Sequence, residues 1–215
     1  MIKRVKNWKA VTISKTRVST YNVLLDNDYL LSELGNIIEL PKKLAASVAK
    51  EWRRNEDVEE IKKKFYTKFC FSVFDHTAPL RLKVLQTILE YADCDLVCYL
   101  AENPIDLVER QKKLFATYID WAEEFLGIKL ITGTGIKHVK QNSQNEAKIK
   151  RYLDKLNDFE LTIVYELTNL TGSFFIATAV YAGVVKAKDA WNASVIEDTY
   201  RIELWGEVPE ETAVS

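Results

Sequence analysis

The stretch FELTIVYELTNLTGSFFIATAVYAGVV, residues 159–185, decides the fold. Glu166 is its only charged residue after Glu160, and apolar residues occur on every side of the helix that it predicts. A helix of this kind must be covered all round, by protein or by lipid. The apolar run after Thr168 is about 17 residues long and is interrupted by small and polar residues, whereas a membrane-spanning helix needs roughly 20 apolar residues. We therefore expect residues 159–183 to form a buried core helix.

The composition is typical of a folded, helix-rich protein. Hydrophobic residues make up 47% and charged residues 28% of the 215 positions, as in a globular chain and unlike a disordered one. The 7 Gly and 4 Pro are few for a turn-rich β-sandwich or barrel. The formal net charge of −1 gives no overall attraction to nucleic acid or to anionic lipid. We expect no nucleic-acid partner and no membrane insertion.

The cysteines and the N-terminal residues bear on the compartment. Three cysteines, an odd number, without a signal peptide predict free thiols in a reducing compartment. Residues 1–13, MIKRVKNWKAVTI, have neither the apolar core of a secretion signal nor the long, Arg- and Ser-rich pattern of an organelle import sequence. We expect a bacterial, cytoplasmic protein.

Residues 1–66 predict a small β-rich domain with one covering helix. The β-forming residues of 17–26 predict a strand, and the turn after them allows residues 29–32 to return as a hairpin partner. Pro41 suits the first position of a helix in which apolar residues recur every four positions up to Trp52. We expect this helix to cover the sheet and Trp52 to be a core residue.

Residues 67–215 predict a larger helical domain built on the apolar helix of residues 159–183. Apolar residues at helical spacing, and helix-starting residues such as Pro104, predict several further helices. The last of them, residues 187–205, ends in Trp205, which we expect to be a buried anchor. The predicted fold class is α+β, a small N-terminal β-rich domain followed by a C-terminal helical bundle.

The sequence contains no pattern typical of a catalytic or metal site. Cys94 and Cys98 lie four residues apart, but the two histidines, His76 and His138, are not at a ligand spacing. Both thiols are therefore expected to be buried and to act as small hydrophobes. The pair Asp75-His76 has no accompanying nucleophile motif. We expect no catalytic residue, no cofactor and no metal.

Several segments, spread along the chain, together resemble one known family. In chain order they are VLLD at 23–26, LP at 40–41, LA at 44–45 with EW at 51–52, DL at 95–96 with CY at 98–99 and AE at 101–102, LVERQ at 107–111, ELT at 166–168, LTGS at 170–173, and the end from ED at 197–198 to WG at 205–206. In this order and at this spacing they resemble the ATP synthase F₁ assembly chaperones that act on the alpha subunit, the ATP-twelve chaperone family. The resemblance covers nearly the whole chain.

The resemblance implies an ATP-independent chaperone that is not an enzyme. Such a protein holds newly made alpha subunit of the F-type ATP synthase until the beta subunit pairs with it. An unpaired alpha subunit exposes a large apolar interface, and such a surface aggregates unless it is covered. We expect the alpha subunit to be the partner, and the chaperone to be a monomer.

The resemblance also places an acidic position that matters for function at Glu197 or Asp198, without deciding between them. Together with Arg201 these are the expected partner-binding residues, on the face of the last helix that points away from its apolar side chains. The small residues of LTGS are expected to allow close helix packing and not to bind a ligand. The expected structural residues are Trp52, Thr171, Gly172, Ser173 and Trp205.

The chain departs from the family pattern at three positions. Phe71 stands where a polar Asn is common, Leu100 where an Arg is usual, and Arg201 where a Gln is usual. The first departure leaves in doubt a polar contact at that position. All three leave room for a partner surface that has changed together with its own alpha subunit.

Two other functions remain open from the sequence. A small-ligand-binding protein or hydrolase would use Asp75, His76 and the Gly133–Gly135 loop, although this loop is more typical of a hairpin turn. A peripheral membrane protein would use the apolar run after Thr168. Mutation of His76 would test the first reading, and extraction of the protein without detergent would exclude the second.

Overall fold

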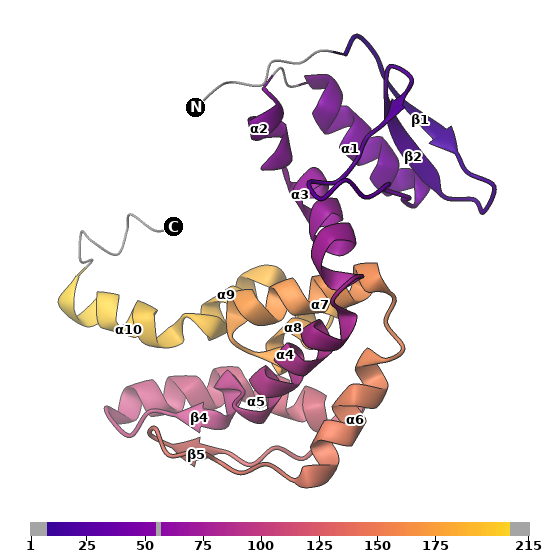
Figure 1. The fold of residues 1–215 in the computed structure, drawn as a ribbon. Helices are drawn as coiled ribbons and strands as arrows, with labels where there is room; N and C mark the ends of the chain where they lie inside the picture. Colours follow the sequence, from indigo (N-terminus) through magenta and orange to yellow (C-terminus); the bar gives the residue numbers. More distant parts are fainter. Residues whose placement is uncertain (1–7, 55–56, 207–215) are drawn as a thin grey trace. The chain divides into compact units, whose positions relative to one another are not determined.

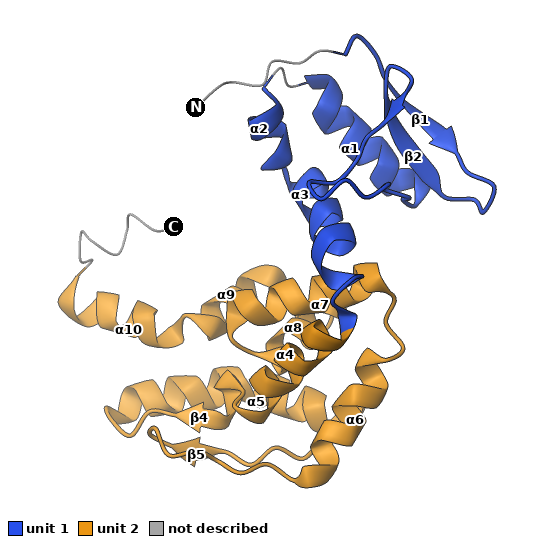
Figure 2. Cartoon of the chain, in the orientation of Figure 1, with its two compact units in different colours: residues 1–81 blue, residues 82–215 orange. Residues whose placement is uncertain are grey.

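The computed structural model describes residues 8–54 and 57–206. The chain forms two compact units, residues 1–81 and 82–215 (Figure 2). The division lies beyond residue 66, the boundary expected from the sequence. Helix α3 (Phe65–Ser72), which spans residue 66, and the π-helical turn that follows it (Val73–Thr77) belong to the first unit. Contacts of Thr67 explain this, because its backbone N–H and hydroxyl both bind the Glu51 carboxylate, at 2.9 and 2.8 Å.

The first unit contains a small antiparallel sheet (Figure 1). Its strands are β1 (Val11–Lys15), β2 (Tyr21–Leu25) and β3 (Asp28–Tyr29), in that order across the sheet. Val11 lies opposite Leu25 and Lys15 opposite Tyr21. The strand expected from residue 17 begins only at Tyr21, because the Thr16 N–H donates to the Thr20 carbonyl at 2.9 Å and closes a turn there.

Helix α1 (Lys42–Arg54) has one apolar face, formed by Ala45, Val48, Ala49 and Trp52, and this face is buried. Trp52 is 3% exposed, and its ring centroid lies 5.1 Å from that of Trp8. Its indole N–H donates to Thr67 Oγ1 at 3.1 Å, so the polar atom of this large side chain has a partner inside the core. A short helix, α2 (Val58–Lys62), lies between α1 and α3 in the chain.

The second unit is mainly helical (Figure 1). Its helices are α4 (Arg81–Asp93), α5 (Ile105–Leu126), α6 (Ser143–Leu153), α7 (Asp158–Thr171), α8 (Phe174–Tyr181), α9 (Ala187–Ser194) and α10 (Ile196–Trp205). A 3₁₀ turn (Leu96–Cys98) precedes β4 (Tyr99–Leu100), which pairs in parallel with β5 (Gly133–Thr134). The expected hairpin around Gly133 and Gly135 is wrong, since this segment pairs with β4 instead.

The central apolar stretch forms two helices, so the expectation of one helix over residues 159–183 is wrong. Helix α7 ends because Gly172 has a left-handed backbone (φ 67°). Ser173 is extended and caps α8, its hydroxyl accepting the Ile176 N–H at 3.0 Å. The apolar residues on all sides belong to α8, whose first six residues are all buried.

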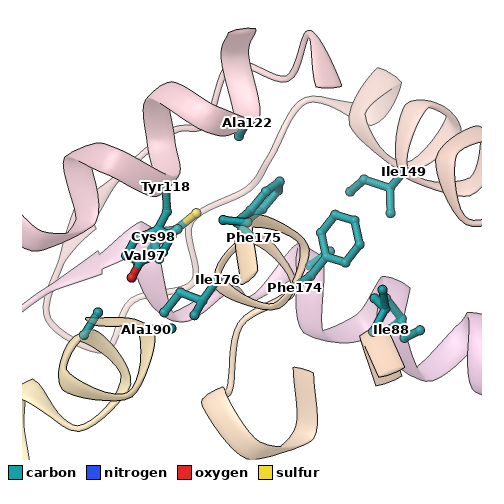
Figure 3. Packing of buried hydrophobic residues seen from close by; sticks show 14 of the residues in the cluster. Ile88, Val97, Cys98, Tyr118, Ala122, Ile149, Phe174, Phe175, Ile176 and Ala190 are labelled. Atoms are coloured by element: carbon teal, nitrogen blue, oxygen red, sulfur yellow. The ribbon is translucent and has the colours of Figure 1, made fainter. Parts of the chain in front are cut away.

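Helix α8 lies in the middle of the core of the second unit. Figure 3 shows its side chains pointing outward in different directions, Phe174 towards Ile149 of α6 and Phe175 towards Ala122 of α5. Phe174 and Phe175 are fully buried and make an edge-to-face contact, with ring centroids 5.2 Å apart. The predicted fold class, α+β with N-terminal strands followed by a helical region, is confirmed.

Candidate functional site

Glu197 is held in place by a buried amide. It lies in the first turn of α10, and its carboxylate accepts a hydrogen bond of 2.8 Å from Gln111 Nε2 on α5. Gln111 is fully buried, and its Oε1 accepts the Ala101 N–H at 2.7 Å. The amide is thus fixed at both ends. Glu197 therefore presents a carboxylate of fixed position on an exposed helix turn.

Asp198 and Arg201 have a different environment. They form an ion pair one turn apart on α10, and their side chains are 59% and 54% exposed. Exposed pairs of this kind contribute little to stability, typically less than about 1 kcal/mol. The structure therefore separates the two acidic candidates, because Glu197 contacts α5 whereas Asp198 points to solvent with Arg201.

Two further contacts join α10 to α5. The Tyr200 hydroxyl lies 2.8 Å from both carboxylate oxygens of Asp106, and Arg110 Nη1 lies 2.6 Å from Glu203 Oε2. The guanidinium of Arg110 also lies over the Tyr200 ring, 5.3 Å from its centroid. The hydrogen bond with Glu203 raises the pKa of Arg110, and the hydrogen bond with Asp106 raises the pKa of Tyr200.

These contacts, together with Gln111–Glu197, form what we call the α5–α10 polar row. Its members are Asp106, Arg110 and Gln111 on α5, and Glu197, Tyr200 and Glu203 on α10. On α5, Arg110 and Gln111 lie four and five residues after Asp106, and on α10 the members repeat every three residues, so each set lies on one side of its helix. The row fixes the orientation of α10 and arranges charged groups of both signs at its surface.

Helix α10 exposes large apolar side chains next to this row. Ile202, Leu204 and Trp205 are 42%, 54% and 76% exposed, and its buried residues are Ile196 and Tyr200. The expected burial of Trp205 is therefore wrong. The expected single helix over residues 187–205 is interrupted at Val195, so its apolar residues do not form one continuous stripe.

The LTGS segment makes a structural contact in the core. Thr171 Oγ1 donates to the Leu167 carbonyl at 2.8 Å, and Gly172 and Ser173 form the break between α7 and α8. Ser173 Oγ lies 2.5 Å from the Asp95 carboxylate. These groups are buried, so the segment orders the start of α8 through hydrogen bonds, in addition to allowing the chain to turn.

Asp75 is hydrogen-bonded to the loop of residues 32–36. Its carboxylate accepts hydrogen bonds from Ser32 Oγ, from the Leu34 N–H at 3.2 Å and from Asn36 Nδ2 at 2.8 Å. In a hydrolase triad the histidine stands between the carboxylate and the nucleophile. Here Asp75 contacts the Ser32 hydroxyl directly, so the pair Asp75-His76 does not have the arrangement of a triad.

The positions that depart from the family pattern have different surroundings. Phe71 is 7% exposed in α3, so an apolar side chain is accommodated there. Leu100 is half-buried in β4, and its carbonyl accepts the Gly135 N–H at 2.8 Å. Arg201 pairs with Asp198, as described above. Arg201 lies on α10, the helix that contributes Glu197, Tyr200 and Glu203 to the α5–α10 polar row.

Sequence reasoning missed most of the polar row. It singled out Glu197 from the resemblance, but not Tyr200 or Glu203, although all three repeat every three residues. Arg110 and Gln111 occur in the LVERQ segment and were not assigned a role. A search for polar residues at helical spacing in the two segments would have found both faces, but nothing in the sequence shows that they meet.

The profile of one protein family, described as ATP12 chaperone protein, matches residues 5–123, more than half of the chain. The chain belongs to this family. ATP12 chaperones assist assembly of the ATP synthase, and the recognition made from the sequence is confirmed. The matched residues include Gln111 and the Asp95 segment, and they end before α10 begins.

Similar proteins extend this ATP12 match over the rest of the chain. A mitochondrial protein named atp12 from Schizosaccharomyces pombe is 24% identical, over 94% of this chain and 74% of its own length. The crystal structure of Atp12 from Paracoccus denitrificans is 28% identical, with a TM-score of 0.90 over 97% of this chain and 90% of that one. An aspartate-to-lysine variant of that Paracoccus protein is 29% identical, with a TM-score of 0.89 over 98% of this chain and 89% of that one.

Among the residues described here, no helix of this ATP12 chaperone is both long enough and apolar enough to cross a membrane.

Proposed function

We propose that this ATP12 chaperone binds the unassembled alpha subunit of the F-type ATP synthase and does so without ATP. The surface used is α10 with the α5–α10 polar row. The observation that supports it is the Gln111–Glu197 hydrogen bond of 2.8 Å, which gives an exposed carboxylate a fixed position beside exposed apolar side chains. Binding interfaces place aromatic and apolar anchors at their centre and polar groups at a solvent-accessible rim.

The mechanism needs binding and no chemical step. An alpha subunit that has not yet met its beta partner exposes an interface of the obligate type, which is large and apolar. A folded protein that covers this interface lowers the concentration of the aggregating species by mass action. It is released when the beta subunit, which binds more tightly, takes its place. The chaperone on this proposal is not an enzyme and uses no cofactor.

Co-expression with the cognate alpha subunit tests the proposal. The soluble fraction of the alpha subunit should rise when this chain is present and should fall again with Glu197→Lys. Glu197→Gln removes the charge but keeps an oxygen that accepts the Gln111 N–H. If the charge itself contacts the partner, Gln and Lys should both reduce rescue, with Lys the stronger. An alpha subunit that is equally insoluble with and without this chain would contradict the proposal.

A matched charge reversal separates the surface from general charge effects. Glu124 is exposed on α5, near its C-terminal end, and belongs to no part of the polar row. Glu124→Lys should leave rescue unchanged. Asp198→Lys, which also breaks the exposed pair with Arg201, should reduce rescue without lowering the melting temperature. Equal loss of rescue with Glu124→Lys would show that the effect is not local to α10.

The remaining parts of the proposal concern the oligomeric state and the cellular compartment. We propose that the chaperone is a monomer, which light scattering after size-exclusion chromatography would measure directly. We also propose that it acts in the bacterial cytoplasm, as expected from the sequence, whereas the fission yeast relative is named as mitochondrial. Fractionation of the source cells would distinguish the two compartments.

A further inference from the structure

Three potential metal ligands lie together in the second unit. Asp93 is the last residue of α4, Cys94 follows it, and His138 lies in the segment between β5 and α6. A ligand atom of each lies within 4.8 Å of the others, and all three residues are exposed. Cys94 was expected to be a buried thiol, and this expectation is wrong. It shares no helix with Cys98, because α4 ends before it.

The separation of these atoms fits a shared metal ion. Cys94 Sγ lies 3.7 Å from His138 Nδ1. In a tetrahedral zinc site, with Zn–S near 2.3 Å and Zn–N near 2.0–2.1 Å, the sulfur and nitrogen are about 3.6 Å apart. The observed distance is therefore close to that of two ligands of one ion. A carboxylate oxygen of Asp93 lies within 4.8 Å of both atoms and supplies the third ligand.

The segment that carries His138 is fixed by hydrogen bonds on both sides. Gln141 pairs with the backbone of Ile131, its Oε1 accepting the N–H at 3.1 Å and its Nε2 donating to the carbonyl at 2.8 Å. The Val139 N–H donates to the Tyr99 hydroxyl at 3.2 Å. The histidine is thus held beside the end of α4 by contacts that do not involve Cys94. A metal ion would meet ligands already placed near their binding positions.

A cavity adjoins two of the three ligands, Asp93 and His138. It has a volume of about 420 Å³ and is lined by residues that include Asp93, His138 and Asn145. Asn145 is only 6% exposed, and its Nδ2 has no hydrogen-bond partner among the described residues. Buried amide donors are nearly always satisfied. An unpaired donor in the wall of this cavity indicates that the cavity receives a polar acceptor.

We propose that Asp93, Cys94 and His138 bind a divalent transition metal ion whose remaining coordination position faces this cavity. One thiolate, one imidazole and one carboxylate form a mixed ligand set that suits Zn²⁺. A water or anion in the open position would accept the Asn145 N–H. The bound ion would join the end of α4 to the segment before α6. The site shares no residue with the α5–α10 polar row.

Cobalt titration of the reduced, metal-free protein tests the proposal. Co²⁺ should bind with one equivalent per chain, giving a thiolate-to-cobalt charge-transfer band and the intense visible bands of tetrahedral Co²⁺. Cys94→Ser should abolish the charge-transfer band. Competition with a chelator should show that His138→Asn and Asp93→Asn each weaken Zn²⁺ binding by at least about tenfold, since each removes a direct ligand. Zn²⁺ should also raise the melting temperature of the wild type, and not that of Cys94→Ser.

Matched variants outside the ligand set serve as controls. Glu90 lines the same cavity and His76 is the other histidine of the chain. Glu90→Gln and His76→Asn should leave the affinity for Zn²⁺ and the cobalt spectrum unchanged. The proposal is overturned if no charge-transfer band forms with Co²⁺ in tenfold excess. It is also overturned if the band and affinity persist in both His138→Asn and Asp93→Asn, because a thiol alone would then account for binding.

Discussion

Ser173 Oγ lies 2.5 Å from Asp95 Oδ1, and both residues are fully buried. They are 78 positions apart in the chain, and each belongs to a segment that carries the family resemblance. Asp95 also accepts the N–H of Phe175, at 3.3 Å, and that of Val97, at 3.2 Å. The carboxyl thus ties the first turn of α8 to the segment that leads into β4. The central core helix is fixed at its N-terminal end by this group.

Replacement of Ser173 by alanine should destabilise the second unit strongly. The substitution removes the side-chain cap of α8, which is worth about 1 kcal/mol. It also leaves a buried carboxyl without one of its donors, which costs a further 1–3 kcal/mol, roughly. We therefore expect a loss of about 2–4 kcal/mol, measured by urea unfolding. Ser143→Ala, on the exposed first position of α6, should change stability by less than about 0.5 kcal/mol.

Asp95 should make stability depend on pH. Burial raises the pKa of this carboxyl from its ordinary value of 3.8 to about 7, and the hydrogen bonds from Ser173 and the backbone oppose the rise. Below pH 3.8 Asp95 binds the proton in both the folded and the unfolded state, and its contribution to the free energy of unfolding is fully present. As pH rises towards 7 the unfolded state releases the proton first, so stability falls. The total loss is on the order of 4 kcal/mol.

Asp95→Asn isolates this contribution from other titrating groups. The amide keeps an oxygen at the same place and does not titrate. The free energy of unfolding, measured from pH 4.5 to 7.5, should fall less steeply in the variant than in the wild type. Parallel curves for the two proteins would show that Asp95 is charged in the folded state throughout this range.

Trp52 of the first unit should be far more sensitive to truncation than the exposed Trp191 of the second. It is 3% exposed, packs against Trp8 and donates to Thr67. Trp52→Ala should cost about 3–5 kcal/mol, since it leaves a large cavity and removes the hydrogen bond to the Thr67 hydroxyl. Trp191 is 47% exposed on α9 and is the matched control. Trp191→Ala should cost much less, and similar unfolding midpoints for the two variants would contradict the packing described here.

The fold class follows from features that act locally. Composition, the β-forming residues near Tyr21 and the apolar periodicity up to Trp52 are sufficient for an N-terminal sheet covered by a helix. The break at Gly172-Ser173 was not predictable in the same way, because Gly and Ser also occur inside closely packed helices. The Ser173 hydroxyl at this break is hydrogen-bonded to Asp95, which lies 78 positions away in the sequence.

The candidate site depends even more on distant pairs. The resemblance identified Glu197 and Asp198, but it could not separate them. The separation comes from Gln111, 86 positions away. The ligand pair Cys94 and His138 was missed for the same reason, because the two residues are 44 positions apart. Spacing rules detect ligands on one helix or turn, and not those that the fold brings together.

Trp205 shows why helical periodicity can fail at a helix that is interrupted. The sequence predicts one helix over residues 187–205, with Trp205 as its buried anchor. At Val195 the backbone departs from helical geometry, with ψ of 21°. The direction of the side chains beyond this point is therefore not set by those before it. Tyr200 of α10 is buried and packs in the core, whereas Trp205 is 76% exposed.

The last prediction concerns this exposed tryptophan. On the proposal that α10 contacts the alpha subunit, Trp205 is an apolar anchor, and tryptophan is prominent among residues that dominate binding energy. Trp205→Ala should leave the free energy of unfolding within about 0.5 kcal/mol of the wild type, because the side chain is largely exposed already. It should lower the yield of soluble alpha subunit on co-expression. Urea unfolding and the co-expression assay measure the two effects separately.

Leu82 provides the matched control for this variant. It is 83% exposed on α4 and carries another large apolar side chain of the same unit. Leu82→Ala should change neither the stability nor the yield of soluble alpha subunit. A fall in yield with both variants would mean that exposed apolar area in general matters, and not α10. A large loss of stability with Trp205→Ala would instead support the structural role that the sequence predicts for this side chain.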